Sequence, residues 1–510
     1  MTHAHVPKQT LSSWPRAKNL LHTSELIQDL TTDVCVVGAG LAGLTTAYLL
    51  AREGRAVVVL DKGSVGGGNT GRTTAQLSNA LDDRYSELIR IHGEAKARLA
   101  AHSHTAAISM IEAIVQEEAI DCDFERVSGY LFVPSATSRK VLDDELEAAH
   151  RVGLTQVERV AQAPLDGFDT LPCLHFPDQG QFDPLKYLNG LAKAVQARGG
   201  QIYTDSPVEQ ITDSQPARVQ TRSGFTVTAA AVVVATNSPI NDRVALHTKQ
   251  APYLSYVIAA EVPRNSVAKA LYWDTEDPYH YVRLQTLDGG ESELLLVGGE
   301  DHKTGQADDA DVRYARLEAW ARERFPSMQR VVYRWSGQVY ESLDGLAFIG
   351  LNPGDKAVYV ATGDSGMGMT HGTIAGMLLR DLIVGNDDAW AVIYDPARKP
   401  FKAAGEFVKD NANVGVQFTD LLTPGSGKAT DEIAPGTGAV VGFGSGKHAV
   451  YRDDTGTLHT HSAICPHLGC VVAWNHGERS WDCPCHGSRF DAYGKVLNGP
   501  AYSDLAATEK

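Results

Sequence analysis

The fold of this chain is decided by one stretch near its start, DVCVVGAGLAGLTTAYLL, residues 33–50. Its first five residues form an apolar run of the kind that makes a strand buried in a parallel sheet, and residues 44–50 predict a helix. Between them, Gly38, Gly40 and Gly43 make the pattern G-x-G-x-x-G, and a second apolar strand ends on Asp61. A strand, a glycine turn, a helix and an acidic residue roughly 20 positions further on together predict a dinucleotide site.

The glycines and the acidic residue have separate tasks in such a site. The glycines let the backbone approach a pyrophosphate at the N-terminus of the helix, and Asp61 can accept hydrogen bonds from ribose hydroxyls. A second loop of small residues follows, GGGNTGRTT at 66–74. This loop would let the backbone pass close to a long cofactor, which favours FAD over NAD; a plain surface loop is the alternative. The binding candidates here are Lys62, Thr70, Arg72 and Thr73.

A later α/β unit supplies a second place where a cofactor could sit. The apolar strand 357–361 leads into a glycine turn, and a helix is predicted over 372–383. The N-terminus of that helix is a second seat for an anion. The candidates for cofactor binding in this turn are Gly363, Gly366, Met367, Gly368, Met369 and Thr370.

Near the far end, two short motifs offer two thiolates and two imidazoles. They are CPH at 465–467 and CPCH at 483–486, so the candidate ligands are Cys465, His467, Cys483 and His486. Two cysteines on one iron and two histidines on the other are the ligands of a Rieske [2Fe-2S] centre. Zinc is the competing interpretation, because Cys₂His₂ also suits a tetrahedral metal. Zinc fingers, however, pair cysteine with cysteine and histidine with histidine, whereas each half-site here holds one of each.

The totals exclude several classes of function. A chain of 510 residues with a net charge of −16 has no basic stripe for nucleic acid. The longest purely apolar run, 229–235, is too short for a membrane span, and the first twenty residues hold no apolar core of a signal peptide. Apart from the four cysteines clustered near the end, Cys35, Cys122 and Cys173 are scattered, as expected of buried thiols in a reducing compartment. These features predict a cytoplasmic protein.

The length of 510 residues predicts about three folding units. Residues 1–30 are a lead-in, and elements that suit an α/β cofactor-binding domain lie at 31–95, 181–250 and 341–385. Strands and turns with a few helices, which suit a substrate domain, lie at 96–180 and 251–340, and a long helical region at 84–120 begins before them. Residues 386–430 form a connection with a flexible linker at 423–428. A small all-β domain takes 431–510, with a hairpin turn at 442–447.

These residues resemble the D-amino-acid-oxidase-like superfamily of FAD-dependent oxidoreductases, which includes glycine and sarcosine oxidases. The resemblance covers about 31–385 and is carried by the glycine pattern, Asp61, the strand 231–237 and residues 358–372. It implies a discontinuous Rossmann-like FAD domain roofed by a mostly antiparallel substrate domain. It also implies that Val208 meets the adenine end through its backbone and that 366–370 line the flavin end. Residues 431–510 resemble a Rieske domain, and the whole resembles bacterial fusions of the two.

Departures from the family bear on the substrate. Amino-acid oxidases of the glycine-oxidase type have an arginine that grips the substrate carboxylate, and the corresponding place here reads GQVY, 337–340. The bidentate clamp on a carboxylate is therefore lost at this place. Where sarcosine oxidases use a lysine in the reaction with oxygen, this chain has Leu296 or a neighbour, which weakens an oxidase interpretation. The catalytic candidates are His302, as a base for an amine, and Arg72, near the flavin or a substrate anion; a surface histidine is the alternative for His302.

The resemblance to Rieske domains implies further details around the ligands. Cys470 and Cys485 stand where Rieske proteins of the respiratory type carry a disulfide; two free thiols are the alternative. Ser488 matches a serine whose hydroxyl bonds a cluster sulfur. The tyrosine expected two positions later is Phe490, so one hydrogen bond is missing. Because such hydrogen bonds raise the potential, we expect this centre to lie below respiratory Rieske centres.

Together these features predict an FAD-dependent oxidoreductase that oxidises a small molecule with a C–N bond. The electrons would pass from the flavin to the Rieske cluster and on to an acceptor, possibly a protein. One alternative is a direct oxidase that reduces oxygen, with a structural or regulatory cluster. The other is a non-catalytic redox carrier or sensor.

Overall fold

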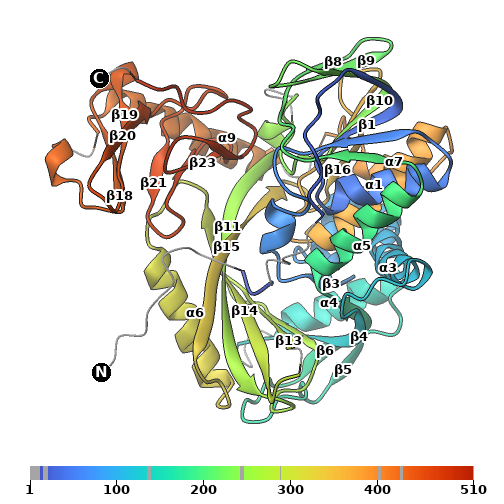
Figure 1. Cartoon of the computed structure of the whole chain (residues 1–510). Helices are drawn as coiled ribbons and strands as arrows, with labels where there is room; N and C mark the ends of the chain where they lie inside the picture. Colours follow the sequence, from blue (N-terminus) through green and yellow to red (C-terminus); the bar gives the residue numbers. More distant parts are fainter. Residues whose placement is uncertain are drawn as a thin grey trace.

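A computed structural model describes residues 12–14, 21–134, 139–241, 246–287, 289–399, 404–425 and 429–508, with backbone alone for 404–410. Most of the predicted lead-in and residues 426–428 of the predicted linker lie outside this description. The described chain forms two large sheets and a separate β domain near its C-terminus (Figure 1).

The first sheet is the mostly parallel sheet that the opening stretch predicts. Its main order is β16-β17-β10-β1-β2-β7, and β9 pairs with both β10 and β8. Strands β1, β2, β7, β10 and β17 run parallel, because β1 pairs in parallel with β2 and β10. The strands are β1 (Leu30–Val37), β2 (Val57–Leu60), β7 (Gln201–Tyr203), β8 (Val208–Thr212), β9 (Ala217–Thr221), β10 (Thr226–Val234), β16 (Phe348–Leu351) and β17 (Val358–Thr362).

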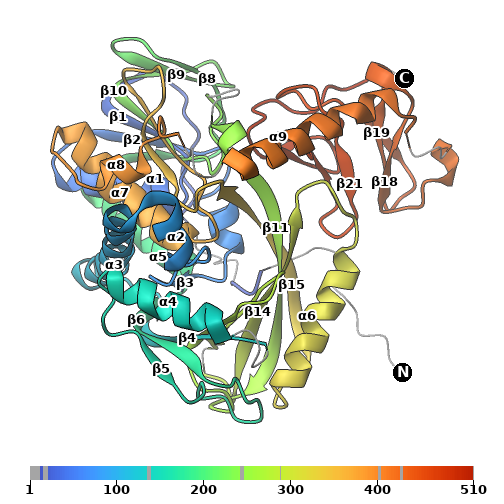
Figure 2. The same cartoon turned by 180° about the vertical axis from the view of Figure 1, so that it is seen from behind.

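Helices cover one face of this sheet (Figure 2). Along β1, Val34 and Val36 join the core beneath the helices, while Cys35 and Val37 join a second core on the opposite face. Both faces are thus buried, which explains the continuous apolar run in the sequence. The helices are α1 (Leu41–Arg52), α2 (Tyr85–His92), α3 (Glu94–Glu117), α5 (Pro184–Ala197), α7 (Gly368–Val384) and α8 (Ala391–Tyr394).

The second sheet has nine strands and is mostly antiparallel. Its main order is β15-β11-β14-β13-β12-β4-β6-β3, and β5 pairs with β6. The strands are β3 (Gln76–Leu77), β4 (Glu125–Phe132), β5 (Glu158–Val160), β6 (Cys173–Gln181), β11 (Gln250–Pro263), β12 (Leu271–Asp274), β13 (His280–Thr286), β14 (Ser292–Lys303) and β15 (Val331–Ser342). Helices α4 (Arg139–Arg151) and α6 (Ala310–Arg324) pack on it. Figure 1 shows β11 and β15 rising from this sheet towards the C-terminal domain.

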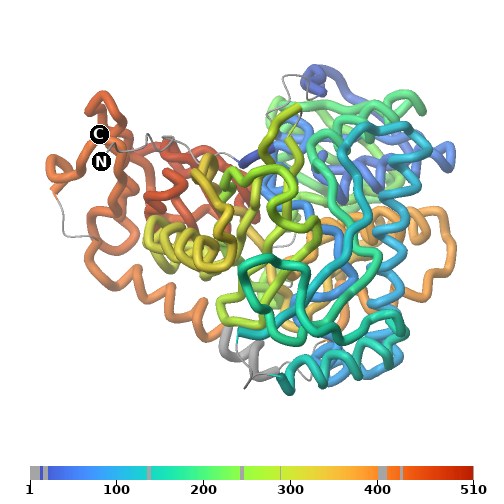
Figure 3. The backbone as a smooth tube through the Cα atoms, turned by 90° about the horizontal axis from the view of Figure 1, so that it is seen from below, coloured from blue at the N-terminus to red at the C-terminus, as the bar shows by residue number. Residues whose placement is uncertain are grey.

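The C-terminal domain consists of a three-stranded and a four-stranded antiparallel sheet, as expected for a small all-β domain. The first holds β18 (Thr437–Val441), β19 (His448–Arg452) and β20 (Leu458–Ser462); the second holds β21 (Ala473–Asn475), β22 (Ser480–Asp482), β23 (Arg489–Asp491) and β24 (Val496–Asn498). The predicted hairpin at 442–447 joins β18 to β19. In Figure 3 this domain lies at one side of the molecule, next to α6.

The fold differs from the sequence-based prediction in three places. The helical region 84–120 is two helices, because Gly93 has φ 83°, a left-handed conformation that ends α2. Helix α7 begins at Gly368 rather than 372, so the glycine turn is shorter than predicted. The connection holds a helix, α9 (Ala404–Phe418), followed by a 3₁₀ turn, Thr419–Leu422.

The fold class is confirmed, while the residue boundaries of the three domains stay a prediction. Among the helices in the described part of the chain, none combines the length and the apolar character needed to cross a membrane.

Candidate cofactor sites and the surface between them

A cavity of about 630 Å³ lies between the two large sheets and the C-terminal domain. The glycine turn after β1 and the loop 66–74 line it from one side, and the turn before α7 lines it from another. Strands β11, β13 and β15 contribute Ser255, Tyr281 and Gln338. Residues 495–499 of the C-terminal domain also line it.

The glycine turn leaves no room for side chains at two positions. A Cβ on Gly38 would lie 2.4 Å from the carbonyl oxygen of Ala235, and one on Gly43 would lie 1.9 Å from the oxygen of Gly38. Gly38 therefore lets β10 pass close by, and Gly43 lets α1 pack against the turn. The start of α1 lines the cavity, where a pyrophosphate would lie at the helix N-terminus, and the N–H of Leu41 donates to the hydroxyl of Thr70 at 3.3 Å.

Asp61 lies where a ribose acceptor is expected, at the end of β2. Its carboxylate accepts from the backbone N–H of Ala39 at 2.6 Å and of Gly63 at 2.8 Å. Burial raises the pKa of this carboxyl, and the two backbone hydrogen bonds counteract that rise. A carboxylate has about four acceptor positions, so it can still accept from hydroxyls. The glycine turn and this carboxylate, which both line the cavity, fit FAD.

Most of the predicted FAD residues line the cavity. They are Gly38, Gly40, Asp61, Lys62, Thr70, Arg72, Thr73, Val208, Gly366, Met367, Gly368 and Met369. Gly43, Gly363 and Thr370 do not line it. Thr370 is buried behind the lining, where its hydroxyl lies 2.8 Å from Nδ1 of His104. Their assignment to FAD stays a prediction.

His302 lies outside this cavity. It is buried on β14 and its ring stacks on Tyr256, with centroids 5.6 Å apart. Tyr256 belongs to the core between the sheet and α6, whereas its neighbours Ser255 and Val257 line the cavity. Because side chains alternate between the faces of a strand, His302 is directed to the helix side. Burial and Arg313 lower the pKa of His302 to about 4. A catalytic role for His302 stays a prediction that this placement does not support.

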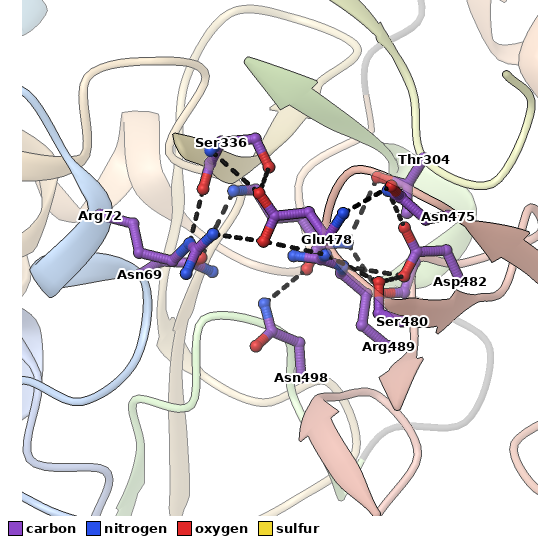
Figure 4. A network of polar contacts seen from close by, with 12 residues as sticks. Asn69, Arg72, Thr304, Ser336, Asn475, Glu478, Ser480, Asp482, Arg489 and Asn498 are labelled. Carbon is purple, nitrogen blue, oxygen red and sulfur yellow. Dashed lines mark hydrogen bonds and ion pairs between the residues drawn. The ribbon is translucent and has the colours of Figure 1, made fainter. Parts of the chain in front are cut away.

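Arg72 contacts the C-terminal domain (Figure 4). Its guanidinium forms an ion pair with Glu478 and donates to the carbonyl oxygen of Ser336 at 2.5 Å. The other oxygen of Glu478 accepts from the backbone N–H and the hydroxyl of Ser336, at 3.1 and 2.7 Å. We call Arg72, Ser336 and Glu478 the clamp. The charge of Arg72 is thus already paired with Glu478. A substrate-binding role for Arg72 stays a prediction.

A carboxylate and aromatic rings line the cavity near the turn before α7. Asp82 lies so close to Gly366 that a Cβ there would be 1.9 Å from its Oδ2, and Tyr279 lies within 3.3 Å of the same oxygen. Trp273 and Tyr281 line the same region. Burial, then Asp83 and Asp301, raise the pKa of Asp82 to about 7. No sequence pattern pointed to Asp82, because the pair Asp82-Asp83 lies in a loop and matches no motif.

The four predicted cluster ligands lie in two adjacent loops of the C-terminal domain. Cys465 and Cys483 are buried free thiols, and the rings of His467 and His486 lie with centroids 5.0 Å apart. Nδ1 of His486 is buried without a hydrogen-bond partner, and burial lowers the pKa of this histidine to about 3. A neutral imidazole with an unused nitrogen, beside two thiols, fits the cluster.

The residues around the ligands agree in part with the resemblance. Cys470 and Cys485 form a disulfide that joins the two loops, as predicted. Ser488 is buried next to this site, and its hydroxyl accepts from the backbone N–H of Ala501 at 3.0 Å. Phe490 is fully buried in the same core as Cys465. The hydrogen bond expected from Ser488 to a cluster sulfur stays a prediction.

The ligand loop is docked on the wall of the FAD cavity. The side-chain amide of Gln338, which lines the cavity, donates to the carbonyl oxygen of Gly487 at 2.7 Å. Tyr340 is buried, and its hydroxyl lies 3.3 Å from the carbonyl oxygen of His486. The ring of His247 lies edge-on to both ligand histidines, with centroids 4.9 Å from His467 and 6.0 Å from His486. Sequence reasoning missed these contacts, which join residues far apart in the chain.

The fold and the two sites define an oxidoreductase that uses a flavin and an iron–sulfur cluster. The chain belongs to the family described as FAD dependent oxidoreductase, whose model matches residues 33–382, and it carries a Rieske [2Fe-2S] domain, matched over 427–509. FAD and a [2Fe-2S] cluster are therefore its cofactors.

Known proteins resemble the chain over its whole length or over its flavin part. It is 30% identical over 509 residues, 99% of each chain, to the Rieske 2Fe-2S iron-sulfur protein YhfW of Bacillus subtilis (strain 168). It is 28% identical over 389 residues to gamma-glutamylputrescine oxidoreductase of Escherichia coli (strain K12), covering 74% of this chain and 89% of the relative. The crystal structure of glycine oxidase from Geobacillus kaustophilus has a TM-score of 0.61 at 19% identity, covering 72% of this chain and 99% of that one.

Proposed function

We propose that this enzyme oxidises a small amine at FAD and that the electrons pass within the same chain to the Rieske cluster, and from there to an acceptor. Bound FAD can take up two electrons and release them singly, whereas the cluster carries one. The observation that supports this proposal most directly is the wall shared by the two sites. Gln338 of β15 lines the FAD cavity and also holds Gly487, next to the ligand His486.

Tyr340, two residues further along β15, makes a second connection on the same face of the strand. Its backbone oxygen accepts from the N–H of Ser365, in the turn beside the flavin end of the cavity, at 3.0 Å. Its hydroxyl lies within 3.4 Å of carbonyl oxygens of His486, Gly487 and Gly499. One buried residue thus joins the turn before α7 to the ligand loop, which supports electron transfer between the two sites.

The cavity favours a cationic substrate over a carboxylate. Among the described residues that line it, each lysine and arginine already has a partner: Lys62 donates to the carbonyl oxygen of Leu497, Arg72 pairs with Glu478, and Arg222 and Lys495 pair with Asp504. Asp82, by contrast, presents a carboxylate among aromatic rings near the flavin end. An ammonium group would form a charge-assisted hydrogen bond there.

One relative agrees with an amine substrate, because its name gives it as an oxidoreductase of gamma-glutamylputrescine. The missing arginine at 337–340 argues against a substrate held by its α-carboxylate. We therefore propose an amine without a carboxylate next to its nitrogen. A cytoplasmic location also stays a prediction, supported by the three buried free thiols Cys35, Cys122 and Cys173.

An anaerobic substrate screen tests this function. The loaded protein is mixed with primary and secondary amines and, in parallel, with α-amino acids, and the absorbances of flavin and cluster are followed together. We expect an amine to bleach the flavin and then the cluster. Bleaching of the flavin with an oxidised cluster would favour the direct oxidase. No bleaching by any amine, with rapid reduction by a reductase, would favour the carrier.

A further inference from the structure

The C-terminal domain forms part of the wall of the FAD cavity. Its segment 495–504, which contains β24, contributes Leu497 and Tyr502 to the lining. These side chains are 41% and 36% exposed, an unusual degree of exposure for large apolar groups at an interdomain surface. The Rieske domain therefore presents apolar surface to the space that FAD occupies.

The contacts of this segment show which half of the cofactor it faces. Lys62 follows the predicted ribose acceptor Asp61, and its ammonium donates to the carbonyl oxygen of Leu497. The guanidinium of Arg222 donates to the carbonyl oxygen of Tyr502 at 3.0 Å, and the backbone N–H of Arg222 donates to Pro207 at 2.8 Å, beside Val208. Leu497 and Tyr502 thus lie opposite the ribose and adenine positions.

We propose that segment 495–504 completes the FAD site by covering the adenosine half of the cofactor. Leu497 and Tyr502 supply the surface for the flat, apolar face of adenine, which aromatic side chains bind by stacking. Lys62 and Arg222 hold the segment in place. FAD is then enclosed between two domains and is retained tightly only while the Rieske domain is docked.

The test compares FAD with FMN, which lacks the adenosine half. The full chain with its cluster loaded is stripped of flavin, and each flavin is titrated back while its fluorescence is followed. In the double variant Leu497→Ala/Tyr502→Ala, we expect the Kd for FAD to rise roughly tenfold or more, given the usual effect of removing a stacked aromatic ring. The Kd for FMN should change by less than about twofold. Tyr502→Phe keeps the ring and should keep FAD affinity.

The control is Tyr333→Ala, because Tyr333 is also 36% exposed but does not line the cavity. It should leave both affinities unchanged. If the double variant fails to take up its cluster, Arg222→Ala replaces it, with the same selective loss of FAD affinity expected. An unchanged Kd for FAD would overturn the proposal. An equal loss of FAD and FMN would overturn it too, because it would show that the segment supports the pocket as a whole.

Discussion

At the scale of single residues, Asp82 is the side chain that most favours an amine substrate. Its carboxylate lies against Gly366 and Tyr279, beside the turn before α7 that the resemblance assigns to the flavin end. Buried carboxylates without a cationic partner resist ionisation, and an ammonium substrate would supply that partner. The carboxylate of Asp82 therefore favours an amine over a carboxylate as the substrate of this cavity.

Replacing Asp82 by Asn should weaken amine binding. A hydrogen bond between charged groups contributes about 1.5–3 kcal/mol, so we expect KM to rise roughly 10- to 100-fold. In the wild type, Asp82 is neutral below its pKa of about 7 and ionised above it. KM should therefore fall as the pH rises through about 7, and this dependence should vanish in Asp82→Asn.

Steady-state kinetics measured over a range of pH check this prediction, and a variant of the neighbouring Asp83 is the control. Its charge raises the pKa of Asp82, and it does not line the cavity. Asp83→Asn should keep the affinity for the amine at high pH but move the midpoint of the KM profile to lower pH. The assignment would be wrong if Asp82→Asn kept the wild-type profile.

Phe490 tests the tuning of the cluster. It is fully buried in the core that contains Cys465 and Cys483, at the position where the resemblance expects a tyrosine. In Phe490→Tyr, the added hydroxyl should restore a hydrogen bond worth about 0.5–1.5 kcal/mol. Because a tenfold change in the equilibrium constant of a one-electron couple corresponds to about 59 mV, the reduction potential of the cluster should rise by roughly 20–60 mV. Redox titration measures this; Phe443→Tyr, at an exposed phenylalanine of the same domain, should leave the potential unchanged. A wild-type potential at the top of the Rieske range would contradict the expectation.

At the scale of elements, β15 has two roles. One part of it, 337–339, lines the FAD cavity, and Ser336, Gln338 and Tyr340 hold the C-terminal domain. If this strand lacks the arginine that grips a carboxylate, as the resemblance implies, the residues that dock the C-terminal domain stand in its place. Our proposal of an amine substrate and the docking of the Rieske domain then rest on the same few residues.

The clamp should control how fast the cluster is reduced. Glu478 has a side chain only 7% exposed, and it accepts from Arg72 and from Ser336. In Glu478→Gln, the loss of a charged hydrogen bond worth about 1–3 kcal/mol should slow cluster reduction roughly 5- to 100-fold. The rate of flavin reduction by substrate should be unchanged. Stopped-flow absorbance separates the two steps.

Glu318→Gln is the matched control for the clamp. Glu318 pairs with Arg322 of α6 and Arg334 of β15, and neither ion pair includes a residue of the C-terminal domain. This variant should leave both steps at wild-type rates. Equal rates in Glu478→Gln and wild type would show that the clamp has no part in docking.

Local features could be predicted from the sequence, and distant contacts could not. The opening strand, turn and helix follow from periodicity and glycines, and the ligand loops from residue type. The ion pair of Arg72 and Glu478 spans 406 positions, which no local pattern reveals. The approximate position of His302 along β14 predicts a side chain near the flavin. A shift of one residue in a strand moves a side chain to the opposite face of the sheet. The side chain of His302 lies on the face that packs against α6.

At the scale of the whole molecule, the two large sheets and the C-terminal domain meet at one cavity. The FAD cavity is lined by both large sheets and by the Rieske domain. The cluster loop contacts His247, Gln338 and Tyr340 of the flavin part. Residues of β15 thus connect the cavity to the cluster loop within one chain, as our proposal of electron transfer between the two sites requires.

We propose above all that electrons move from flavin to cluster inside one chain. Anaerobic stopped-flow measurement of cluster reduction by an amine substrate, over a range of protein concentrations, tests this proposal. A transfer within the chain predicts that the cluster bleaches after the flavin, with a rate constant that does not depend on protein concentration. A rate that rises in proportion to protein concentration, or a cluster that stays oxidised beside a reduced flavin, would contradict the claim.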